Sequence, residues 1–234
     1  LADTTETCAI TVPNCSSELV VPPGSSRAFL APTTCQRDPV SVIDLDACKH
    51  EQNLPGFGPV ALSQNGRTAV AFVDRDASDP NAPPLPADVK ASAERYHLMF
   101  IAVDTLAYGT TPIGDALPRY AVTPDGKLLL VDAWLSQDNV RIVDVDDRSI
   151  RTVSGQHVQL ESYALLPDSS AGFALWSGSL FRIDLPLATS ERLSLGFTPT
   201  SLNVTPKGEL LLKEGAGIVH LYDAHAEREV GTFQ

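Results

Sequence analysis

Short apolar runs separated by turn-forming residues recur along most of the chain, and residues 118–147 show the pattern most clearly. Each run is too short for a helix and is bounded by turn signals, so it predicts a strand. At Pro124-Asp125-Gly126, Pro pre-sets φ, Asp bonds its own backbone and Gly accepts positive φ, which is the chemistry of a tight turn. The pattern predicts four antiparallel strands, at residues 120–123, 127–132, 140–144 and 149–153.

This unit repeats, because an apolar residue followed by Asp closes the third strand each time. The positions are Asp44, Asp104, Asp144, Asp184 and Asp223, separated by 60, 40, 40 and 39 residues. Turn residues between the first and second strands recur in the same phase. A period near 40 with one four-stranded unit per repeat is typical of β-propeller blades. The sequence therefore predicts an all-β β-propeller of four-stranded antiparallel blades, with five repeats and five or six blades.

The five Asp residues are interpreted as structural. Each carboxylate is expected to accept hydrogen bonds from backbone N–H groups one or two residues later, which fixes the turn into the outer strand.

The longer first interval predicts an insertion of about twenty residues in the second blade, between its second and third strands. Residues 74–86 are acidic and rich in proline, and 87–95 are expected to form two helical turns. The propeller is assigned to residues 19–234. Residues 1–18 form a separate N-terminal segment, in which 9–12 can add a strand that completes the last blade and removes an open sheet edge.

Two segments, Thr123-Pro124-Asp125-Gly126 and Val42-Ile43-Asp44, carry a resemblance to a known repeat family. Over roughly residues 19–233 the pattern resembles the YVTN-type repeats of lactonase-like and surface-layer propellers. The resemblance implies the architecture and not the function, because one such fold hosts binders, enzymes and scaffolds. Lactonase-like relatives use polar residues around the central channel, but no motif here allows a catalytic residue to be carried over.

The charge of the chain excludes some partners. Its formal net charge is −12, and it has no clustered Lys or Arg to neutralise phosphates, which argues against nucleic acid and against an anionic membrane surface. No apolar run of 18 residues is present, so no transmembrane segment is predicted.

Four cysteines lie in the first fifth of the chain, as the close pairs Cys8 with Cys15 and Cys35 with Cys48. A zinc site is the weaker interpretation, since no Cys-x-x-Cys is present and His50 is the only imidazole nearby. Two disulfides, 8–15 and 35–48, are favoured among the three possible connectivities, and they imply an extracytoplasmic location: secreted, cell surface or periplasmic. The first residues show no secretory signal, so the chain is interpreted as a mature or trimmed form.

The insertion contains Asp74, Asp76 and Asp79, hard oxygen ligands at a spacing that a loop can wrap around Ca²⁺. The EF-hand spacing is not met. An acidic loop open to solvent is the favoured interpretation, with Ca²⁺ as the alternative and no other cofactor expected.

Two tryptophans, Trp134 and Trp176, follow the second strands of neighbouring blades and should share a rim with the insertion. Exposed Trp is enriched at recognition surfaces and sugars stack on it, although a Trp at a strand end can also only fill the gap between blades. Asp138 beside Trp134, and Arg75 in the insertion, are the candidate polar contacts. The expected partner is a protein or glycan at the cell surface, with membership of a larger assembly left open.

No nucleophile motif such as Gly-x-Ser-x-Gly occurs, and no catalytic residue is predicted. His220 alternates with Val219 and Leu221 and is interpreted as a half-buried strand residue. The leading hypothesis is a non-catalytic binding or scaffold propeller. The alternatives are a lactonase-like metal-dependent hydrolase and a structural subunit of a surface layer or filament.

Overall fold

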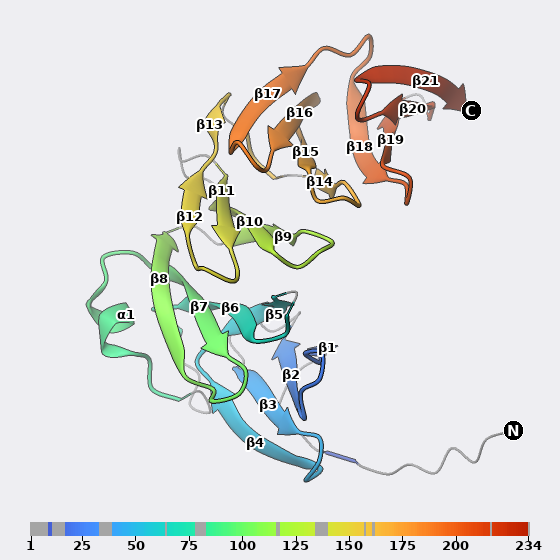
Figure 1. Cartoon of the computed structure of the whole chain (residues 1–234). Helices are drawn as coiled ribbons and strands as arrows, with labels where there is room; N and C mark the ends of the chain where they lie inside the picture. Colours follow the sequence, from blue (N-terminus) through green and yellow to red (C-terminus); the bar gives the residue numbers. More distant parts are fainter. Residues whose placement is uncertain are drawn as a thin grey trace, which may run out of the picture. The chain divides into compact units, whose positions relative to one another are not determined.

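The computed structural model describes residues 9–10, 17–32, 39–63, 65–77, 83–115, 118–133, 140–156, 158–160, 162–215 and 217–233. The chain divides into two compact units, residues 1–115 and 116–234 (Figure 1). The described residues form five sheets, two in the first unit and three in the second.

Two four-stranded antiparallel sheets make up the first unit, and the strands of each follow one another in chain order. The first sheet contains β1 (Ser17–Val20), β2 (Arg27–Pro32), β3 (Val40–Asp44) and β4 (Lys49–Leu54). The second contains β5 (Phe57–Leu62), β6 (Thr68–Asp74), β7 (Tyr96–Ala102) and β8 (Tyr108–Gly114). The short helix α1 (Ala87–Ala91) lies between β6 and β7, in the predicted insertion, but it is shorter than the two turns predicted over 87–95 because Ser92 is already extended.

Three sheets make up the second unit. The first has β9 (Pro118–Val122), β10 (Leu128–Ala133), β11 (Arg141–Asp144) and β12 (Ile150–Thr152). The next has β14 (Ser162–Leu165), β15 (Ala171–Trp176), β16 (Ser179–Asp184) and β17 (Thr189–Leu193), to which β13 (Ser154–Gly155) adds a parallel edge. The last has β18 (Pro199–Val204), β19 (Glu209–Glu214), β20 (Val219–Asp223) and β21 (Arg228–Phe233).

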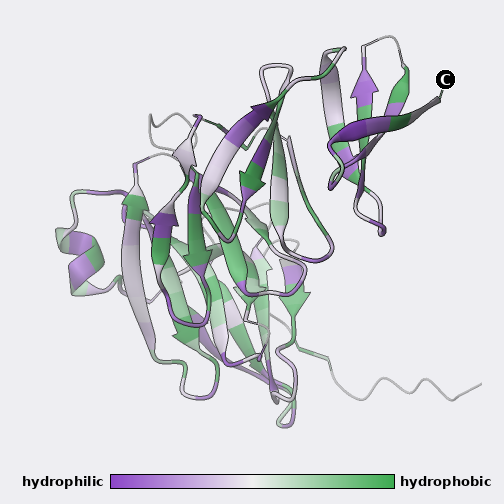
Figure 2. Cartoon of the chain, turned by 45° about the horizontal axis from the view of Figure 1, so that its top comes forward, coloured by the Kyte–Doolittle hydropathy of each residue, from purple (hydrophilic) through white to green (hydrophobic). Residues whose placement is uncertain are grey.

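The core lies between successive sheets of each unit. One buried cluster joins the two sheets of the first unit, and two more join neighbouring sheets of the second. Leu129, Leu130 and Val131 of β10 are at most 2% exposed, so this strand is buried on both faces. Hydrophobic positions run along the strands, whereas α1 carries both hydrophilic and hydrophobic positions (Figure 2). Val89 is the buried residue of α1, and it joins the core cluster of the first unit.

The recurrent Asp residues close the turns between third and fourth strands. The carboxylates of Asp44, Asp144, Asp184 and Asp223 all accept backbone N–H groups, at 2.8–3.0 Å. Their donors lie two or three residues later, so the prediction of one or two was too short. The reason is that the chain must turn before an N–H group points back at the carboxylate. Four of the five repeats therefore carry the predicted local bond.

Turns between first and second strands pack against each other in neighbouring sheets. In the first unit, a Cβ atom on Gly66 would lie 2.9 Å from Pro23 Cδ. In the second unit, the Asp125 N–H donates to Ser169 Oγ at 3.3 Å, and Gly208 lies beside Leu166. Within each unit the sheets therefore follow one another with the same edge inward, as propeller blades do.

The predicted fold class, a β-propeller of four-stranded antiparallel blades in five repeats, is confirmed. Strand β13 was not predicted, because two polar residues carry no periodicity. It exists because Gly155, with φ +102°, brings its backbone against Ser190; a Cβ there would lie 2.4 Å from the Ser190 carbonyl oxygen. Most of the N-terminal segment lies outside the described residues, so its strand and the 1–18/19–234 division stay predictions.

Candidate functional site

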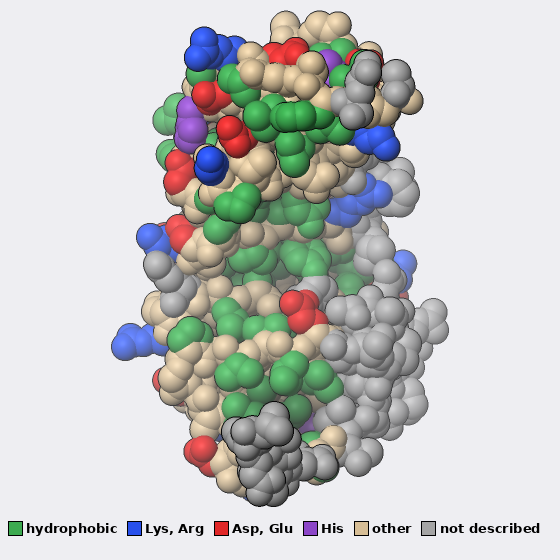
Figure 3. Space-filling view, turned by 90° about the vertical axis from the view of Figure 1, so that its right-hand side faces the viewer, with side chains coloured by type: hydrophobic (Ala, Val, Ile, Leu, Met, Phe, Trp, Pro, Cys, Tyr) green, Lys and Arg blue, Asp and Glu red, His purple; other side chains and the backbone are tan. Residues whose placement is uncertain are grey.

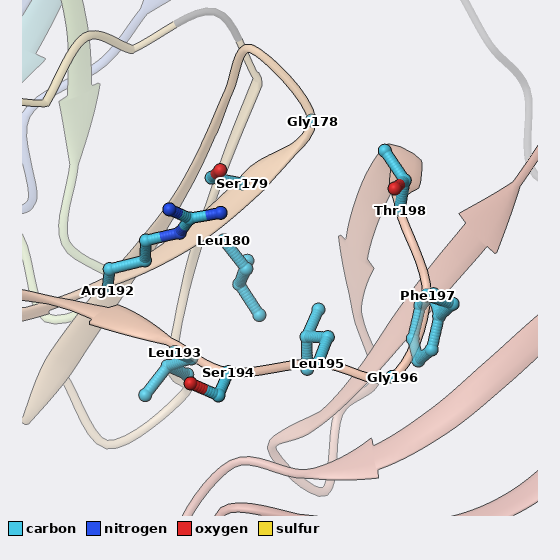
Figure 4. A pocket seen from close by; sticks show the side chains of 10 residues that line it. All are labelled: Gly178, Ser179, Leu180, Arg192, Leu193, Ser194, Leu195, Gly196, Phe197 and Thr198. Atoms are coloured by element: carbon cyan, nitrogen blue, oxygen red, sulfur yellow. The ribbon is translucent and has the colours of Figure 1, made fainter.

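The second unit contains a pocket of about 380 Å³, formed by the β15–β16 hairpin, β17 and the segment that leads to β18 (Figure 4). It lies at the tips of strands two and three, where the sequence placed a binding surface. The residues that line it are Gly178, Ser179, Leu180, Arg192, Leu193, Ser194, Leu195, Gly196, Phe197 and Thr198.

The hairpin that forms one wall has a tight two-residue turn. Ser177 and Gly178 have φ +51° and +72°, and Trp176 pairs with Ser179 across the turn. Positive φ at both central positions is characteristic of a type I′ hairpin, in which Gly carries no Cβ penalty. A Cβ on Gly178 would lie 2.7 Å from Thr198 Cγ2. The tip of the hairpin therefore abuts the segment across the pocket.

The floor of the pocket is apolar. Leu180 and Leu193 are 1% and 8% exposed and belong to the core cluster between the last two sheets. Leu195 and Phe197 pack on the same cluster and remain partly exposed. The floor is therefore continuous with the core, which makes it a rigid surface.

The rim of the pocket is polar. Among the described residues, the side chains of Arg192, Ser179, Ser194 and Thr198 make no hydrogen bond or ion pair. Figure 4 shows Arg192 and Ser179 on one side of the pocket and Thr198 and Phe197 on the other. Donors and acceptors from both sides are thus available to a ligand.

The aromatic wall is fixed from behind. The Phe197 ring stacks on His220, with centroids 3.5 Å apart and planes at 7°. His220 is 8% exposed, and its Nδ1 and Nε2 lie 3.2 and 3.4 Å from carboxylate oxygens of Glu229 and Glu214. The Nδ1 contact with Glu229 holds the imidazole, whereas Nε2 makes no hydrogen bond among the described residues. The stacked imidazole in turn supports one face of the phenyl ring. His220 is more buried than the half-buried strand residue that the sequence predicted.

Trp176 lies near this pocket but does not line it. Its ring centroid is 6.1 Å from that of Phe181, and the side chain packs on the core cluster between the third and fourth sheets. These contacts match the alternative in which Trp at a strand end fills space between blades. Its role in ligand binding stays a prediction.

In the insertion, the acidic residues are held by arginines. Asp74 accepts a two-pronged contact from Arg95, at 2.9 and 2.8 Å. Asp76 lies 3.1 Å from Arg75 Nε and 3.6 Å from Arg95 Nε. Arg75 also donates to the Ser92 and Ala93 carbonyls, so its guanidinium links the start of the insertion to the segment that follows α1.

The described residues contain no group of three or more His, Cys, Asp or Glu side chains that could hold a metal ion. Asp79 lies outside them, so the Ca²⁺ site at Asp74, Asp76 and Asp79 remains a prediction.

Helix α1 docks on β8 through a short hydrogen bond, in which Thr110 Oγ1 donates to Asp88 Oδ2 at 2.6 Å. This bond is the main cause that lowers the pKa of the Asp88 carboxyl below its ordinary value; desolvation opposes the shift and backbone hydrogen bonds add to it. Arg95 has a raised pKa, chiefly because it hydrogen-bonds to Asp74. At the base of the insertion, Asp74 and Asp88 are therefore paired, whereas Glu94 Oε2 is buried without a hydrogen-bond partner among the described residues.

The other candidate residues, Trp134, Asp138, Cys8, Cys15 and Cys35, lie outside the described residues. Cys48 is described and is not a free thiol. The pairings 8–15 and 35–48, like the binding roles of Trp134, Asp138 and Arg75, stay predictions.

Sequence reasoning missed Arg192, Phe197 and the supporting role of His220. Arg192 follows Glu191 on a polar edge strand, which is typical of a solvated face. Its lack of a partner depends on tertiary contacts, so the sequence carries no signal for it. Phe197 offered one, as an isolated aromatic between Gly196 and Thr198 at a strand start.

Charge on the surface is mixed. On the face shown in Figure 3, Lys and Arg side chains lie scattered among Asp and Glu and do not gather into a basic patch within the described part. No helix in that part is long and apolar enough to cross a membrane.

Comparison with known proteins identifies the fold and no family. No family model matches the chain, and no curated protein does. An oligogalacturonate lyase in complex with manganese shares 13% identity at a TM-score of 0.55; the match covers 91% of this chain and 63% of that one. A functionally unknown protein from Desulfotomaculum acetoxidans DSM 771 shares 16% identity at a TM-score of 0.55; the match covers 95% of this chain and 71% of that one. The Kuenenia stuttgartiensis hydrazine synthase shares 16% identity at a TM-score of 0.49; the match covers 92% of this chain and 70% of that one.

The two matches at 0.55 support a β-propeller. At such low identity they show the fold alone. The chain spans less than two thirds of the lyase.

Proposed function

We propose that this chain is a non-catalytic, extracytoplasmic binding propeller that holds a glycan in the pocket of its second unit. The observation that carries the proposal is the rim of Arg192, Ser179, Ser194 and Thr198, whose side chains have no partner among the described residues, around an apolar floor. The accessible lining is mostly polar, which suits a ligand that itself carries many polar groups.

The chemistry of the lining favours a sugar. Serine and threonine hydroxyls both donate and accept, as sugar hydroxyls do, so each can pair with one without leaving an unsatisfied group. The Phe197 ring, held by His220, offers an aromatic surface for the C–H face of a pyranose. A pocket of about 380 Å³ is at the small end of the range for ligand sites, which suits one sugar unit.

The location rests on the cysteines, whose paired spacing suits an oxidising compartment. The lactonase-like hydrolase and the surface-layer subunit remain alternatives, and no contact among the described residues favours either one. The name of one structural neighbour, an oligogalacturonate lyase, connects a propeller with a carbohydrate, but a shared fold does not transfer activity.

The test is to fill the pocket without disturbing the fold. Gly196 lines the pocket, and a Cβ there meets no atom within 4 Å, so Gly196→Phe places a ring in the cavity. Gly109 of β8 is equally open and lies in the other unit, so Gly109→Phe is the matched control. The purified chain is screened against a panel of immobilised glycans.

We expect the wild type and Gly109→Phe to retain the same glycan and Gly196→Phe to lose it. Retention by Gly196→Phe at wild-type strength would show that the pocket is not the binding site.

A further inference from the structure

We infer that the glycan is acidic, with a sugar carboxylate bound by Arg192. This inference rests on the proposed function and specifies the ligand class of the same pocket.

Among the described residues Arg192 has no partner, although the chain is acidic, with 17 Lys and Arg against 29 Asp and Glu. Arg182, on the adjacent strand β16, is by contrast paired: it lies 3.4–3.8 Å from carboxylate oxygens of Asp184, Glu191 and Glu227. No such partner surrounds Arg192 among the described residues. With so many carboxylates in the chain, an arginine without one beside a pocket is available to an external anion.

A carboxylate suits this cation by geometry. The guanidinium is planar and presents two parallel N–H groups, which match the two oxygens of a carboxylate. It stands beside the apolar floor made by Leu180 and Leu195 (Figure 4). Next to apolar surface an ion pair is screened less than one fully surrounded by water, so the contact contributes more to binding.

The rest of the lining distinguishes an acidic sugar from a simple anion. Inorganic phosphate or acetate would use Arg192 but not the hydroxyl of Thr198 and the ring of Phe197 on the opposite side. A uronic acid carries hydroxyls and an apolar C–H face on the same ring as its carboxylate. It can therefore contact both sides of the pocket at once.

The experiment is a titration of the full chain with methyl β-D-glucuronide, methyl β-D-glucoside and inorganic phosphate, followed by NMR. Arg192→Gln removes the charge. Arg67→Gln is the matched control, because Arg67 is also exposed, has no side-chain partner among the described residues and lies in the other unit. Gly196→Phe reports whether binding uses the pocket.

The glucuronide is expected to bind at least about tenfold more tightly than the glucoside, because its carboxylate forms a charge-assisted hydrogen bond with Arg192 that the glucoside lacks. Arg192→Gln should bring the glucuronide to the affinity of the glucoside, and Arg67→Gln should change neither.

Any one of three results would overturn the inference: equal affinity of the glucuronide and the glucoside, an unchanged affinity of Arg192→Gln for the glucuronide, or an affinity for phosphate as high as that for the glucuronide. If only neutral sugars bind and Gly196→Phe abolishes their binding, the proposed glycan-binding function is supported and the inference that the glycan is acidic is wrong. If no sugar, in the titration or on the glycan panel, depends on the pocket, both fall.

Discussion

The phenyl ring of Phe197 lies flat against the imidazole of His220, 3.5 Å between centroids and 7° between planes. Phe197 belongs to the segment before β18, and His220 to β20 of the same sheet. The imidazole is in turn held through Nδ1 by Glu229 of β21, and Glu214 of β19 lies 3.4 Å from Nε2. One wall of the pocket is thus positioned by residues that do not touch a ligand there.

Removing this support should loosen the wall. We expect His220→Ala to lower the free energy of unfolding by about 1–3 kcal/mol, as loss of a buried side chain and its contacts typically does. The Phe197 ring resonances should move and glycan affinity should fall.

His225→Ala is the control, because the His225 side chain is 62% exposed. Unchanged Phe197 resonances in His220→Ala would show that the stacking does not position the ring.

The hairpin tip beside Thr198 gives a test of close packing. Gly178 has φ +72°, so Gly178→Ala adds backbone strain of about 1–2 kcal/mol and a contact 2.7 Å from Thr198 Cγ2. Gly24 has φ +71° and open space around it, so Gly24→Ala adds strain alone.

Chemical denaturation should show a larger loss of stability for Gly178→Ala than for Gly24→Ala. Thr198→Ser removes Cγ2, so the double variant Gly178→Ala/Thr198→Ser should lose only about as much stability as Gly24→Ala. Equal losses in the two single variants would contradict the contact.

A buried carboxylate holds the connection between two sheets of the second unit. Asp132 is 1% exposed, and its Oδ2 accepts the buried N–H of Leu160 at 2.8 Å. Asp132→Ala leaves that N–H without its acceptor, so we expect a loss of about 2–3 kcal/mol in the free energy of unfolding.

Urea titration measures this loss. The exposed Asp46 serves as the control, since Asp46→Ala should fall within about 0.5 kcal/mol of wild type. A similarly small effect at Asp132 would show that the bond contributes little.

Acid should weaken the first turn of the third sheet. Burial tends to raise the pKa of Asp125, but the hydrogen bonds from Thr123, the Lys127 N–H and Ser169 outweigh it and lower the pKa. A carboxyl whose folded pKa is depressed contributes stability that is present above the unfolded value near 3.9 and is lost as pH falls through the folded pKa.

We therefore expect Asp125→Asn to reduce the slope of unfolding free energy against pH below about 4. Stability measured between pH 5 and 2 tests this. An identical slope in wild type and Asp125→Asn would refute the assignment.

The sequence predicted the fold well because each repeat carries its own local signals. Residues such as Pro124, Asp125 and Gly126 fix a turn by short-range chemistry, and the apolar run at 128–132 then has one stable environment, between neighbouring sheets. The Asp at the end of the third strand also bonds to its own turn, which is why its regular spacing of about 40 residues could be recognised in the sequence.

The pocket could not be predicted in the same way. Its residues look ordinary in sequence: Arg192 resembles any charge on an edge strand, and Ser194 any polar linker residue. What makes them a candidate site is that no side chain of the described residues pairs with them, and that follows from the packing of one sheet on the next. Trp176 contacts Phe181, which fits the gap-filling interpretation, and its role in ligand binding stays a prediction.

Chemical-shift mapping of the full chain with its bound glycan shows whether the pocket of the second unit is the binding site. We predict that the backbone amides of Leu180, Arg192 and Phe197 shift together with ligand concentration, and that Gly196→Phe abolishes those shifts. Shifts confined to the insertion at residues 83–95, with the pocket amides unmoved, would contradict this prediction.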